Sequence, residues 1–111
     1  MKNLAQQIEQ LNENLAIQLP KEILEIFSKS IQDLKTKNIE ENSIDIGNFF
    51  PNFSLSNTNG EIVKLKELLI NGKVIVVFFR GNWCPYCNLE LKALQDNLKE
   101  ISDRKTTLVA I

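Results

Sequence analysis

Apolar residues recur at spacings of three and four along the first part of the chain, as they do on one face of an α-helix. The first series is Leu4, Ile8, Leu11 and Leu15. Pro20 then interrupts the pattern. A second series follows at Leu24, Phe27, Ile31 and Leu34. Because proline is tolerated in the first turn of a helix, the pattern predicts two helices, the second ending near Asn38.

These two apolar stripes have two interpretations. In the first, which we favour, the helices form a hairpin that packs on its own domain. In the second, they pair with another copy of the chain and make a homo-oligomer. About two heptads per helix are fewer than the three or four that identify a coiled coil.

From Gly47 onward the pattern is that of strands. Residues 53–55 alternate between apolar and polar positions, and residues 61–65 have the composition of a returning strand. Between them, Asn57-Thr58-Asn59-Gly60 is typical of a turn. This segment predicts a β-hairpin. A short helix over 66–70 is expected next, ending at Asn71-Gly72.

The last forty residues predict a strand, a helix and a second strand. Residues 74–79 are continuously apolar, which is typical of a strand covered on both faces. Apolar positions at 89, 91, 94, 98 and 101 predict one helix of about four turns, and 107–111 predicts another buried strand. With short connections this is a βαβ unit with parallel strands and a right-handed crossover.

We therefore predict an α/β fold with a helical extension over residues 1–40 and an α/β domain over 41–111. A hairpin and two parallel strands make a thin sheet, and the chain stops on an apolar strand. We expect the sequence to be a fragment of a larger fold, or its sheet to be completed by a partner chain.

Composition narrows the classes of function. The formal net charge is −1, so no basic field favours nucleic acid, and no histidine is present to serve as a general base or metal ligand. The N-terminus lacks the pattern of a secretory signal, and no run reaches the ~18 apolar residues of a membrane helix. These features predict a soluble, cytoplasmic protein.

The only two cysteines, Cys84 and Cys87, stand where the first parallel strand gives way to the helix. Free N–H groups and the helix dipole in a first turn stabilise a thiolate, so Cys84 is the expected nucleophile. Cys87 lies one turn later, at a spacing that a disulfide accepts. We expect Cys84 to be exposed at the helix tip and to attack, and the more shielded Cys87 to resolve the mixed disulfide.

Two other interpretations of the cysteines remain open: a metal site, or an inert buried pair. Zinc normally takes four ligands, and the chain offers one cysteine pair, so we expect no metal and no cofactor beyond the pair. Arg80 either lends positive charge to the thiolate or only solvates the strand end. Trp83 is expected to shield the thiol and form a docking surface, and Pro85 to start the helix.

The stretch Arg80-Gly81-Asn82-Trp83-Cys84-Pro85-Tyr86-Cys87, with Pro51-Asn52-Phe53-Ser54-Leu55 before it, resembles the thioredoxin-fold superfamily. Within it, the hairpin resembles the peroxiredoxin-like branch called alkyl hydroperoxide reductase/thiol-specific antioxidant. The resemblance covers about residues 47–111 and implies the N-terminal half of a thioredoxin-like fold. It also implies that Trp83, Pro85 and Tyr86 shape a redox-active centre, since Trp83-Cys84 is similar to the thioredoxin site and Pro85-Tyr86 is the glutaredoxin dipeptide.

The peroxiredoxin motif Pro-x-x-x-Thr/Ser-x-x-Cys places its cysteine on Cys87, but Cys84 and Arg80 replace its other two residues. This departure favours thiol–disulfide exchange on protein or small-molecule disulfides, with a thioredoxin- or glutathione-like electron donor. One alternative is an antioxidant peroxidase in which a hydroperoxide reacts with Cys87. A second is a truncated, non-catalytic redox-switch or interaction module.

Overall fold

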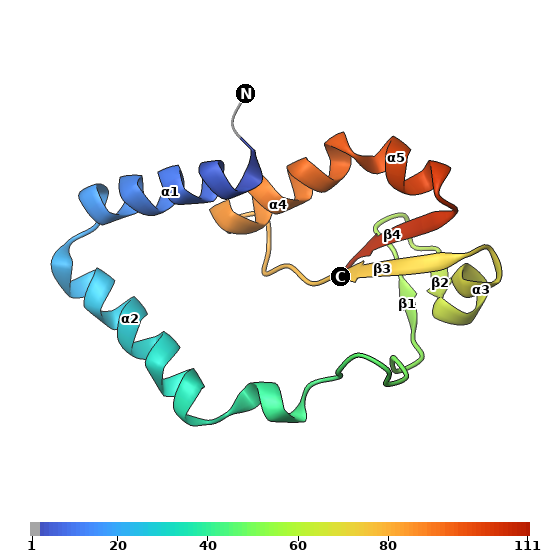
Figure 1. Cartoon of the computed structure of the whole chain (residues 1–111), viewed down its shortest axis with the longest axis horizontal. Coiled ribbons are helices and arrows are strands. Elements are labelled where there is room, and N and C mark those ends of the chain that lie inside the picture. The colour runs from blue at the N-terminus through green and yellow to red at the C-terminus, as the bar shows by residue number, and fades with distance from the viewer. Residues whose placement is uncertain (1–2) are drawn as a thin grey trace. The chain divides into compact units, whose positions relative to one another are not determined.

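The computed structural model describes residues 3–111 of the chain (Figure 1). Residues 5–50 form one compact unit, and Pro51–Ile111 makes up most of a second. The domain boundary expected between residues 40 and 41 stays a prediction. None of the helices in the described part of the chain is long and apolar enough to cross a lipid bilayer.

The first unit is helical. Helix α1 spans Leu4–Gln18 and helix α2 spans Lys21–Thr36, which confirms both predicted helices. Pro20 is the N-cap residue of α2, just outside its first turn. A short 3₁₀ helix, η1 at Ile39–Asn42, follows and was not predicted.

The apolar stripes of α1 and α2 do not form the expected helical hairpin. The two helices do not pack against each other along their lengths. On α2, Phe27 keeps 53% of its surface exposed, and Ile26 and Ile31 are also exposed. Spacing along the chain predicts which residues share a helix face but not what that face contacts. The predicted hairpin contact between the two helices is therefore wrong, while packing of the helices on the domain and self-association both stay predictions.

The second unit begins with the expected β-hairpin. Strands β1 (Ser54–Ser56) and β2 (Ile62–Lys64) pair antiparallel. The turn is closed by the Asn57 side chain, whose Oδ1 accepts from two backbone N–H groups, those of residues 59 and 61, at 2.9 and 3.0 Å. Helix α3 (Leu65–Ile70) follows directly, with Leu65 buried at its first position.

The two predicted parallel strands are also present. Strand β3 (Lys73–Val77) pairs parallel with β4 (Thr106–Ala110), with Ile75 opposite Leu108. Backbone hydrogen bonding continues past the strands, because Phe79 donates its N–H to the carbonyl of Ile111 at 3.1 Å. The hairpin and the parallel pair are separate two-stranded sheets.

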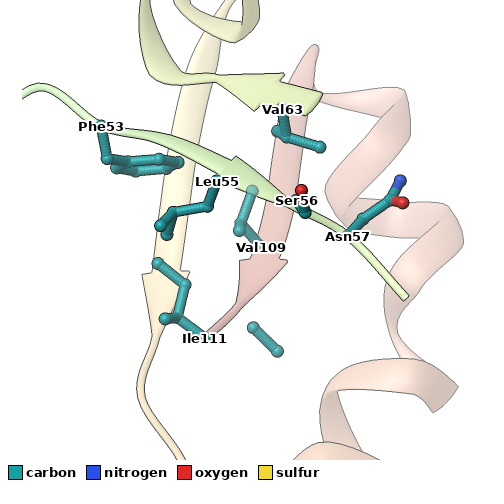
Figure 2. Close-up of a pocket in the computed structure, with 8 residues that line it drawn as sticks. Phe53, Leu55, Ser56, Asn57, Val63, Val109 and Ile111 are labelled. Atoms are coloured by element: carbon teal, nitrogen blue, oxygen red, sulfur yellow. The ribbon is translucent and has the colours of Figure 1, made fainter. Parts of the chain in front are cut away.

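Strand β3 is shorter and less covered than its apolar sequence predicts. It ends at Val77, and Ile75 remains 40% exposed, so the prediction of a strand covered on both faces is wrong. The hairpin places apolar side chains beside the C-terminal end of β4 (Figure 2). There it helps to line a cavity of about 140 Å³, with Phe53, Leu55 and Val63 facing Val109 and Ile111.

The predicted four-turn helix is interrupted. Helix α4 covers Pro85–Asp96 and helix α5 covers Leu98–Asp103, with non-helical dihedrals at Asn97 (φ −106°, ψ 8°) between them. The Asn97 side-chain amide donates to the carbonyl of Ala93 at 2.8 Å. Such local side-chain bonding competes with the helical backbone pattern and accounts for the break at Asn97. The apolar periodicity continues across this position and does not reveal the break.

A close contact between two backbone segments lies at the start of both parallel strands. Lys105, just before β4, has a left-handed backbone (φ 54°), and its carbonyl accepts from the N–H of Lys73 at 3.2 Å. Gly72 (φ +141°) lies directly against that carbonyl, where a Cβ atom would collide with it. Glycine is therefore required at Gly72 for β3 and β4 to begin in register.

Candidate redox site

The site is built where the chain leaves β3 and enters α4. Cys84 is the N-cap residue of α4, and Pro85 is its first helical residue, as predicted from the sequence. A proline there has the φ angle of a helix and lacks only an N–H that would have no helical partner. Cys84 donates its N–H to the carbonyl of Gly81 at 3.1 Å, which closes the loop ahead of the helix.

Cys84 and Cys87 are joined by a disulfide at the start of α4. Their Cα atoms are 5.3 Å apart, inside the ~4.4 to 6.8 Å that a disulfide accepts. The backbone N–H of Cys87 also donates to Cys84 Sγ at 3.3 Å. This is the geometry of a helix cap, with a sulfur as acceptor in place of the usual oxygen.

Arg80 contacts both sulfurs. Its guanidinium Nη2 lies 3.5 Å from Cys84 Sγ, and its backbone N–H lies 3.5 Å from Cys87 Sγ. Cys84 Sγ therefore has two donors, one of which carries a full positive charge. Cys87 Sγ has one, a neutral backbone group, among the contacts the structure gives.

Trp83 lies outside the core, as expected, with 66% of its surface exposed. Its ring supports the side chain of Arg80, whose Cζ atom lies 5.0 Å from the ring centroid. Gly81 lies beneath the ring: a Cβ atom there would come within 2.5 Å of Trp83 Nε1. The loop is held from α4 by Asn88, whose side chain donates to the carbonyl of Asn82 at 2.9 Å.

The relative exposure of the two cysteines is opposite to the prediction. Cys84 is only 1% exposed, while Cys87 is half-buried. The loop before α4 folds back onto Cys84, the N-cap residue of that helix, through the Cys84–Gly81 backbone hydrogen bond. The guanidinium of Arg80 lies against Cys84 Sγ. A position at the end of a helix in sequence is thus not an exposed position once the preceding loop folds over it.

A cavity of about 390 Å³ opens at the disulfide. Its lining is mostly aromatic, with one cation beside the two sulfurs: Phe78, Phe79, Arg80, Cys84, Tyr86 and Cys87. Four of the six predicted site residues are among these. Phe78 and Phe79 were not predicted as site residues, because both belong to an apolar run that is typical of a buried strand.

Asn82 and Asn88 were also missed. Their only signal in the sequence is that each is a polar residue within six positions of a cysteine. In the part of the chain that the structure covers, no three or more cysteine, aspartate or glutamate side chains are grouped so as to hold a metal ion.

Comparison with known proteins places the second unit in a family. Residues 46–111 match the AhpC/TSA family model, which agrees with the extent of the resemblance inferred from the sequence. No solved structure matches the chain significantly.

Two curated relatives show the kinds of protein that this chain is similar to. The thiol-disulfide oxidoreductase ResA of Bacillus subtilis (strain 168) is 33% identical over 69 residues, covering 62% of this chain and 37% of ResA. The 1-Cys peroxiredoxin PER1 of Hordeum vulgare is 34% identical over 68 residues, covering 61% of this chain and 31% of PER1. The chain therefore spans about a third of the length of these relatives. The two relatives are thus a thiol-disulfide oxidoreductase and a peroxiredoxin. Because the family model covers more than half of its residues, the chain belongs to the AhpC/TSA family.

Proposed function

We propose that this chain carries out thiol–disulfide exchange, with Cys84 as the attacking thiolate and Cys87 as the resolving thiol. The observation that carries this proposal is the unequal environment of the two sulfurs. Cys84 Sγ accepts from the Cys87 N–H at the start of α4 and lies beside the Arg80 guanidinium. Both contacts favour negative charge on Cys84 over Cys87.

The exchange proceeds in two steps, in which the cysteine pair is oxidised and the substrate disulfide is reduced. In the reduced protein the Cys84 thiolate attacks one sulfur of a substrate disulfide, forming a Cys84–substrate disulfide and releasing the other half as a thiolate. Cys87, after losing its proton to solvent, attacks Cys84 Sγ and releases the second substrate thiolate. The Cys84–Cys87 disulfide remains, and two thiols of a thioredoxin- or glutathione-like donor reduce it again.

The small exposure of Cys84 defines how a substrate reaches it. Both sulfurs line the aromatic cavity of about 390 Å³, so a substrate disulfide enters beside Phe78, Phe79 and Tyr86. The apolar lining favours disulfides flanked by apolar groups, since these groups are removed from water on binding.

Single-cysteine variants test the assignment of the two roles. With oxidised glutathione, C87S is expected to accumulate a mixed disulfide on Cys84, whereas C84S is expected to react at least tenfold more slowly at pH 7, because its remaining thiol lacks the charged donor. Intact mass after acid quenching measures both. Turnover of a disulfide substrate by C84S at the wild-type rate would overturn the assignment.

A second function, thiol peroxidase, is favoured by one observation: Cys87 is the more exposed cysteine. In that reaction the Cys87 thiolate attacks a hydroperoxide, becomes a sulfenic acid and releases an alcohol or water. The Cys84 thiol then condenses with the sulfenic acid, which forms the disulfide and releases one water. In C84S, a trapped sulfenic acid on Cys87 with hydrogen peroxide or cumene hydroperoxide would support it. Peroxide consumption no faster than that of a free thiol would exclude it.

If neither disulfide nor peroxide reacts faster with the wild-type chain than with free cysteine, the third alternative gains support. The chain would then be a redox-switch or interaction module in which the pair is oxidised and reduced without turnover.

A further inference from the structure

We propose that Trp83 and Arg80 act as one positioning device, in which the indole ring holds the Arg80 guanidinium on Cys84 Sγ and so selects Cys84 as the thiolate. This inference rests on the proposed exchange function and names the residues that control its site. Trp83 is a positioning residue because it acts on the sulfur through Arg80.

The guanidinium is the charge that discriminates between the two sulfurs. Among the residues that line the cavity at the disulfide, Arg80 alone has a formal charge, and Tyr86 is the one other titratable group besides the cysteines. Its Nη2 lies 3.5 Å from Cys84 Sγ, whereas only its backbone N–H approaches Cys87 Sγ.

Arg80 needs a support because its side chain is exposed. A long exposed side chain samples many rotamers, and the entropy lost in fixing one of them offsets most of an ion pair at a surface. A guanidinium stacked on an indole face has already lost part of that freedom. The 5.0 Å separation between Arg80 Cζ and the Trp83 ring centroid is within the ~6 Å of such a contact.

The loop backbone holds the ring in place. Gly81 leaves room beneath it, since a side chain at that position would meet Trp83 Nε1. Asn88 fixes the loop from the helix by donating to the Asn82 carbonyl at 2.9 Å. Residues 80–83 of the loop between β3 and α4 thus connect an exposed aromatic ring to a sulfur that is almost fully buried.

The experiment measures the pH at which half of the Cys84 thiol is ionised, from thiolate absorbance at 240 nm, in the C87S background. This readout does not require exchange activity, so it can fail while the proposed function survives. Arg80→Met is expected to lower the thiolate fraction near neutral pH by about 3- to 10-fold. Arg104→Met, an exposed arginine at the end of α5, removes the same charge elsewhere and is the matched control.

Trp83 variants test the coupling. Trp83→Leu is expected to give most of the Arg80→Met shift, and Trp83→Phe a smaller part, because a phenyl face also binds a guanidinium. The double variant Arg80→Met/Trp83→Leu is expected to match Arg80→Met alone. Arg80→Lys, which keeps the charge but not the planar stacking group, is expected to be intermediate.

Two outcomes would overturn the proposal. One is an unchanged ionisation midpoint in Arg80→Met, which would show that the guanidinium does not act on the thiolate. The other is additive shifts from Arg80→Met and Trp83→Leu, which would show that the ring acts on the sulfur directly. Thermal unfolding of each variant separates these results from loss of the fold.

Discussion

At the scale of single residues, the two sulfurs differ more than their spacing indicates. Cys84 and Cys87 are one helical turn apart and are joined, as the sequence predicts. The structure adds that the buried sulfur is the one with the charged donor. Burial alone disfavours a thiolate, so the donors at Cys84 must offset its desolvation for the proposed mechanism to operate.

Gly81 is the residue in the loop least able to tolerate a side chain. Its backbone (φ +155°) is one that other residues rarely adopt, and a Cβ atom would displace the Trp83 ring. G81A is expected to lower the free energy of unfolding by about 1–3 kcal/mol and to change the fluorescence of Trp83, the only tryptophan. Guanidinium denaturation followed by tryptophan emission measures both.

Gly60 is the matched control for this prediction. It also has a positive φ (+79°), but a Cβ atom added there would meet nothing within 4 Å. G60A is expected to show the backbone cost without the change in native-state fluorescence. Equal fluorescence changes in the two variants would contradict a contact between residue 81 and the Trp83 ring.

At the scale of elements, local patterns predicted most of the helices and the strands, but not the residues at which they begin and end. The apolar positions from 89 to 101 continue across Asn97, and their spacing holds no sign of the break that its side-chain bond to Ala93 produces. Likewise, β3 ends at Val77 although the apolar run continues through Phe79. Strand ends depend on the pairing partner, which a single segment does not specify.

The N-cap of α4 gives a prediction at this scale. In C84S a hydroxyl replaces the sulfur that accepts from the Cys87 N–H, whereas C84A leaves that donor without its cap. C84S is expected to be more stable than C84A by about 0.5–2 kcal/mol in denaturant unfolding. Both variants lack the disulfide, so its contribution cancels. Equal stabilities would show that the cap does not contribute.

At the scale of the whole molecule, the described chain has little fully buried apolar surface. The hairpin and the parallel pair are separate sheets, and many large apolar side chains on both units remain exposed. The family match begins at residue 46 and covers only the second part of the chain. Location in the cytoplasm and assembly into a homo-oligomer stay predictions.

The redox state is expected to change the stability of the whole chain only slightly. A disulfide stabilises mainly by restricting the unfolded chain, and this one closes a loop with two intervening residues. Reduction is expected to lower the free energy of unfolding by less than about 2 kcal/mol, since the loop is short and the donors at Cys84 stabilise the released thiolate.

Denaturant unfolding with and without a phosphine reductant measures this difference, and C87S, which cannot form the disulfide, is the control that reductant should leave unchanged. A loss well above about 2 kcal/mol in the wild-type chain would indicate a structural staple rather than an exchange pair.

The sequence by itself determined the kinds of element, the βαβ order and the position of the two cysteines between strand and helix. These depend on periodicity, on turn residues and on a spacing of three, all of which are local. Only the tertiary structure decided which sulfur is buried, that Arg80 contacts it, and that Trp83 supports Arg80. Those contacts depend on how one loop folds back onto the helix that follows it, and no pattern of apolar and polar positions specifies that path.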